Sequence, residues 1–126
     1  MESYGNAAMR VDLAVRNLRV LARQAMRALE VGDEVPAVVP DAMRELAEAV
    51  ASVRGGLDYP EGREQTRRLA LRAGAMATRA LDESSSMSVN VLVAQIRSMA
   101  VDLISGLGEE PASAQSAVRE AADPSG

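Results

Sequence analysis

The stretch SVNVLVAQIRSMAVDLI (residues 88–104) decides the fold class, because its apolar residues recur with the period of an α-helix. Spacings of three and four residues place them in one stripe: Val89, Leu92, Val93, Ile96, Met99, Ala100, Leu103 and Ile104. A stripe of this width is typical of a helix that buries one face in a core. We therefore predict a helix from about Met87 to Leu107, capped by one of the preceding serines.

The same period recurs in three segments upstream, so the sequence predicts four amphipathic helices. The other three are expected over residues 7–29, from residue 40 to the glycines at 55 and 56, and from Asp58 to the serines at 84–86. Short loops between them predict an all-α, antiparallel four-helix bundle that occupies residues 1–108. The residues expected in its buried stripes include Leu18, Leu21, Met26, Leu29, Leu69, Met76, Ile96 and Leu103.

Residues 109–126 differ in composition from the rest of the chain. They are rich in alanine, serine, glutamate and proline, and Val118 is their only sizeable aliphatic residue. So little apolar surface cannot offset the entropy lost on ordering a segment. We expect residues 109–126 to form a mostly disordered tail, with transient helix at most around residues 114–121, that contributes nothing to stability.

The residue types that the chain lacks exclude several function classes. It contains no histidine, cysteine, tryptophan or phenylalanine, and all its cationic side chains are arginine. Disulfides and the usual zinc sites are therefore excluded, and the commonest catalytic bases and nucleophiles are missing. We predict a protein that is not an enzyme and that uses no cofactor and no metal. A net charge of −4 without a cationic run predicts no general affinity for nucleic acid. No apolar run approaches the roughly 20 residues that are needed to span a bilayer.

Two sets of residues on the long helices are candidates for binding. Arg16, Arg19, Arg23 and Arg27 fall on one side of the first helix, where they form an anion or lipid-headgroup site, a salt-bridged docking face or an ordinary solvated face. Leu13 and Val20 lie off the main stripe of the first helix, as Val91 and Val101 do on the last. Apolar residues on a second side indicate either a partner, for which a two-fold homodimer is the simplest case, or scattered surface aliphatics.

Two segments resemble parts of one protein family. Residues 12–23 (DLAVRNLRVLAR) and 88–104 are similar to helices near the end of actinobacterial membrane proteins of the fusaric-acid-resistance-like (FUSC), or aromatic acid exporter, family. In that family a soluble helical portion follows the transmembrane helices on the cytoplasmic side. The resemblance implies a cytoplasmic domain at the inner face of the cell membrane, with the transmembrane portion of the parent protein as its partner. It implies no catalytic residue.

Three functions remain open at this point. The first is a non-catalytic cytoplasmic domain of a membrane exporter, serving assembly or regulation. The second is a stand-alone helical adaptor of the bacterial cytoplasm that forms homodimers. The third is a helical bundle that senses a small carboxylate through its arginines.

Overall fold

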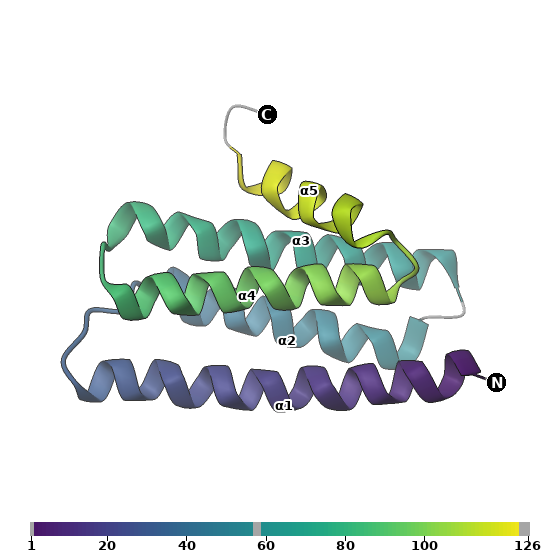
Figure 1. Cartoon of the computed structure of the whole chain (residues 1–126), viewed down its shortest axis with the longest axis horizontal. Helices are drawn as coiled ribbons and strands as arrows, with labels where there is room; N and C mark the ends of the chain where they lie inside the picture. Colours follow the sequence, from purple (N-terminus) through teal and green to yellow (C-terminus); the bar gives the residue numbers. More distant parts are fainter. Residues whose placement is uncertain (1, 57–58, 124–126) are drawn as a thin grey trace.

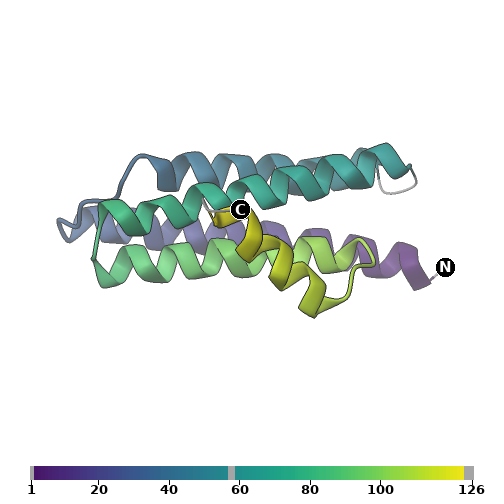
Figure 2. The same ribbon diagram turned by 90° about the horizontal axis from the view of Figure 1, so that it is seen from above.

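The computed structural model describes residues 2–56 and 59–123 and contains five helices and no strand over these residues (Figure 1). They are α1 (Glu2–Glu30), α2 (Val38–Gly56), α3 (Pro60–Glu83), α4 (Met87–Gly106) and α5 (Pro111–Ala122). The first four alternate in direction, so the beginning of α1 lies at the same end of the bundle as the end of α4 (Figure 1). Figure 2 shows α5 crossing α3 and α4 obliquely.

Helix α4 is the centre of the structure, because over the described residues it is the helix that contacts all four others. Seven of its residues are buried: Val89, Leu92, Val93, Ile96, Met99, Ala100 and Ile104. The predicted stripe is therefore confirmed except at Leu103, which is half-buried. Of the described helices, α4 alone is long and apolar enough to cross a membrane, although the sequence did not suggest such a segment. Its position among four packed helices explains that composition.

Helix α3 turns its smallest side chains towards the core. Its buried residues are Thr66, Ala70, Ala73, Gly74, Ala77 and Ala80, whereas Leu69 and Met76, which the sequence placed in the stripe, are half-buried. The prediction followed side-chain size, but the facing aliphatic residues of α4 already fill the interior. Close packing then leaves room only for small residues on the opposing helix. Asp58, where this helix was expected to begin, lies outside the described residues.

Helix α1 buries a narrower stripe than predicted. Over the residues whose burial is described, only Ala14, Leu21 and Ala28 are fully buried, and Leu18 is half-buried. Met26 and Leu29 were expected in the core but are exposed. The reason is that, over the described residues, α1 packs against α2 and α4 alone, so its flanks are not covered by a third of these helices.

The predicted four-helix bundle with a disordered tail is wrong, because α5 packs against α3 and α4 as a fifth helix. Ala114 and Val118 are buried, in a second core cluster with Ala70, Ala100 and Ile104. These two residues are four apart and share one helix face, which a count of large aliphatic residues overlooks. Gly74 permits the close approach, since a Cβ atom at that position would lie 3.2 Å from Val118 Cγ1.

The packing of α4 predicts a large difference between two truncations on this helix. Ile96→Ala removes a fully buried side chain and should lower the free energy of unfolding by about 2–5 kcal/mol. Val91→Ala is the matched control, because Val91 is exposed and its loss should cost less than about 0.5 kcal/mol. Urea denaturation measures both values. Equal effects of the two substitutions would show that the buried face of α4 is misassigned.

The docking of α5 predicts that Val118→Asp releases this helix from α3 and α4. Burying an unpaired carboxylate is costly, so the free energy of unfolding should fall by at least about 1 kcal/mol. Trypsin should then cleave faster after Arg119, which lies next to the substitution on α5. Ala121→Asp, at an exposed position of the same helix, should change neither quantity. If Val118→Asp changes neither the stability nor the rate of cleavage, α5 is not docked on α3 and α4, and the disordered tail expected from the sequence would be correct.

Candidate functional site

The four arginines predicted on one side of the first helix are all exposed on α1. Among the described residues, none of Arg16, Arg19, Arg23 and Arg27 has a carboxylate oxygen within 4.0 Å. Arginines elsewhere do form ion pairs: Arg44 with Asp41, Arg67 with Glu109 and Arg72 with Glu45. The four α1 arginines therefore form no ion pair with the described carboxylates, which is compatible with an anion site, a docking face or a solvated face.

The residues predicted to contact a partner have two different environments. Leu13, Val20 and Val91 are exposed, with exposed fractions of 54%, 37% and 45%. Val101 is instead half-buried and packs against the second core cluster, because α5 covers that part of α4. The sequence analysis missed Met26, which is 60% exposed on α1. The one feature of the sequence that could have indicated its exposure is the position of Met26 at the edge of the predicted stripe.

A groove of about 510 Å³ runs between α1 and α4 and ends at the turn that leads into α5. Its lining residues are Val11, Leu13, Ala14, Asn17, Val53, Met99, Val101, Asp102, Leu103, Ser105, Gly106, Leu107, Pro111 and Gln115. Most of these side chains are apolar, and the only charged one is Asp102. None of Arg16, Arg19, Arg23 and Arg27 lines the groove. The groove and the α1 arginines are thus separate features, which removes support for a carboxylate sensor.

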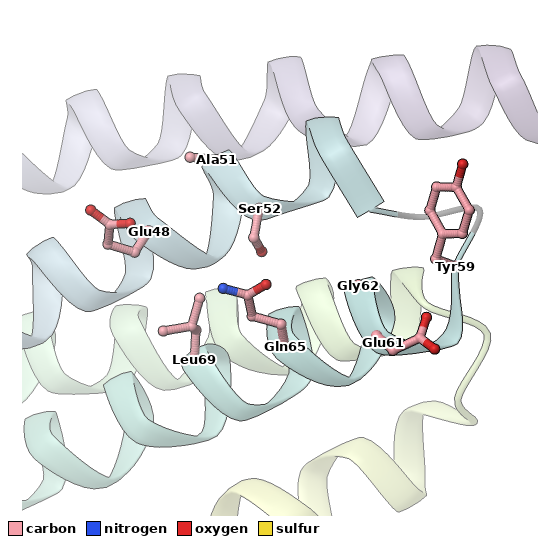
Figure 3. A pocket seen from close by; sticks show the side chains of 8 residues that line it. All are labelled: Glu48, Ala51, Ser52, Tyr59, Glu61, Gly62, Gln65 and Leu69. Carbon is pink, nitrogen blue, oxygen red and sulfur yellow. The ribbon is translucent and has the colours of Figure 1, made fainter.

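A second hollow, of about 570 Å³, lies between the end of α2 and the beginning of α3 (Figure 3). The residues that line it are Glu48, Ala51, Ser52, Tyr59, Glu61, Gly62, Gln65 and Leu69. Figure 3 shows Ser52 and Gln65 pointing towards each other across it. The Ser52 hydroxyl lies 2.6 Å from the hydroxyl of buried Thr66, and each also contacts a backbone carbonyl of its own helix. These hydroxyls therefore connect α2 to α3 and are not paired with a catalytic base.

An ion pair holds the turn between α4 and α5 against α3. Arg67 Nε donates to Glu109 Oε1 at 2.9 Å, and Ser113 Oγ donates to the other carboxylate oxygen at 3.1 Å. The hydrogen bond from Arg67 lowers the pKa of Glu109 below its ordinary value of 4.5, and that from Ser113 lowers it further. The same pair raises the pKa of Arg67. Glu109 lies in the segment expected to be a disordered tail, and here it anchors the start of α5.

Neither hollow contains an arrangement typical of catalysis or metal binding. Over the described part of the chain, no group of three or more carboxylate, histidine or cysteine side chains is placed to hold a metal ion. Comparison with known protein families, with curated proteins and with solved structures found no match. The candidate site that remains is the outer face of α1, defined by its four arginines together with Leu13, Val20 and Met26.

The anchoring of α5 predicts a pH-dependent effect of Glu109→Gln. Because the folded-state pKa of Glu109 is lowered, the pair stabilises the protein above the unfolded-state pKa, and this contribution disappears as the pH falls through the folded-state value. Near neutral pH the substitution should lower the free energy of unfolding by up to about 1 kcal/mol. The effect is no larger because solvent screens an ion pair that is partly exposed. Denaturation across a pH series measures the difference from the parent protein, which should close below pH 4.5. Glu110→Gln removes the same charge from the neighbouring residue and should show no pH-dependent difference from the parent protein. A loss of stability in Glu109→Gln that is the same at every pH would contradict the role of the ion pair.

Proposed function

We propose that this chain is a non-catalytic cytoplasmic domain of a membrane exporter of the aromatic-acid type, and that it serves assembly or regulation. The observation that carries the proposal is the outer face of α1. This is the longest of the described helices, yet it fully buries only three of the residues whose burial is described. A helix that leaves Leu13, Val20 and Met26 in water gains stability when another surface covers it.

The resemblance of residues 12–23 and 88–104 to the exporter family supports the same proposal. These segments correspond to α1 and α4, which pack side by side in the bundle. One of them is the helix that organises the core, and the other carries the uncovered face. A domain built in this way has a packed interior and one helix with an uncovered face.

A homodimerising adaptor is the second candidate. The exposure of Leu13, Val20 and Val91 favours it, because a two-fold contact is the simplest way to cover exposed apolar residues without another protein. An adaptor of this kind would act as an independent chain in the cytoplasm.

Immunoblotting of the source cells tests the proposed function against the adaptor. An antibody raised against this chain should detect a polypeptide clearly larger than 13.3 kDa in the membrane fraction, since the exporter domain is joined to transmembrane helices. Washing the membranes with carbonate should leave it in place. A polypeptide of 13.3 kDa in the soluble fraction would contradict the exporter domain and support the adaptor.

A further inference from the structure

The charge on α1 is opposite in sign to the charge of the whole chain. The net charge is −4, but residues 13–29 contain four arginines and no acidic residue. All four arginines are exposed, and among the described residues none is within 4.0 Å of a carboxylate oxygen. The outer face of α1 therefore carries a local positive charge that no carboxylate among the described residues neutralises by direct contact.

The arginines form a narrow row. At 100° per residue they fall within an arc of about 80°, and at 1.5 Å per residue the row from Arg16 to Arg27 is about 16 Å long. Asp12 and Glu30, both exposed, fall in the same arc at the two ends of the row and reduce its net charge to +2. Exposed apolar residues border this arc on both sides, Leu13 and Val20 at one edge and Met26 at the other. An exposed helix face that combines arginine with aliphatic side chains is typical of helices that lie on a membrane surface.

Charge and polarity argue against the other occupants of this face. A two-fold contact of α1 with α1 would bring arginine against arginine, which is repulsive. Nucleic acid would satisfy the arginines through its phosphates, but its backbone offers no apolar surface to the exposed valine and methionine. A free small anion would need a cavity, and the groove beside α1 is lined by Asp102 and by none of the four arginines.

We propose that the outer face of α1 binds an anionic lipid surface. Arg16, Arg19, Arg23 and Arg27 contact the headgroup phosphates, while Val20 and Met26 enter the interface beside them. Arginine suits this role because its guanidinium donates two parallel hydrogen bonds to a phosphate. The inference goes beyond the proposed function, since it concerns the chain itself and holds whether or not the chain is part of an exporter.

Co-sedimentation of the full chain with lipid vesicles tests the proposal. Vesicles of phosphatidylcholine mixed with phosphatidylglycerol should bind the protein, and vesicles of phosphatidylcholine alone should not. Binding should weaken steeply when salt is added, because the Debye length falls to about 3 Å at 1 M. Such binding by an acidic protein requires a local basic face.

Matched variants assign the binding to α1. Arg16→Gln combined with Arg23→Gln should reduce binding about twenty-five-fold, at roughly fivefold for each basic residue. The control combines Arg68→Gln with Arg79→Gln, which removes the same charge from exposed positions on α3 and should leave binding unchanged. Met26→Ser should weaken binding, whereas Leu81→Ser, at an exposed position of α3, should not. Circular dichroism verifies that each variant remains helical.

Three results would overturn the proposal. The first is a chain that does not bind the anionic vesicles at low salt. The second is an equal loss of binding in the α1 and α3 arginine variants, which would reflect overall charge alone. The third is a dimer in analytical ultracentrifugation that dissociates on mutation of Arg16 and Arg23, since a second copy would then occupy this face.

Discussion

The structure depends on the close contact of the small inner face of α3 with the apolar faces of α2 and α4. Over the described residues, the side chains that α3 buries are no larger than threonine. The chain has no phenylalanine or tryptophan with which to fill a wider space. Helices must then approach closely so that alanine methyl groups contact the leucine, valine and isoleucine side chains of α4. The contacts of α4 with α1, α2 and α5 are organised around the position that this packing gives it.

The sequence predicts the helices better than the faces that they bury. The stripe of α4 is almost entirely correct, because its buried residues are large and strongly periodic. On α3 the same reasoning selects Leu69 and Met76, although the buried positions hold alanine and glycine. Large apolar residues identify the buried face of a helix only where other helices surround that face. Whether a small residue is buried against a large one depends on the facing helix, which the sequence of the segment itself does not reveal. The same limitation explains why α5, which docks through Ala114 and Val118, was not foreseen.

The candidate site shows a similar division. The exposure of the four arginines and of Leu13 and Val20 follows from their angular positions on α1, so it was predictable. The half-burial of Val101 was not, because it depends on α5. The exposure of Met26 was not predictable either, since it requires knowing that α1 contacts only α2 and α4. A helix at the edge of a bundle therefore has more surface available for binding than its own periodicity indicates.

The core and the proposed binding face thus lie in different parts of the molecule. Helices α2 to α5 hold one another through two core clusters, and α1 adds one narrow stripe to the first of them. Hydrogen exchange of the unmodified chain tests this organisation most directly, because each amide reports the free energy of the opening that exposes it. The slowest amides should lie in the central turns of α4, α5 should be protected well above the rate of an unfolded peptide, and α1 should exchange faster than α4. Unprotected amides throughout α5, or protection of α1 that exceeds that of α4, would contradict a five-helix unit centred on α4.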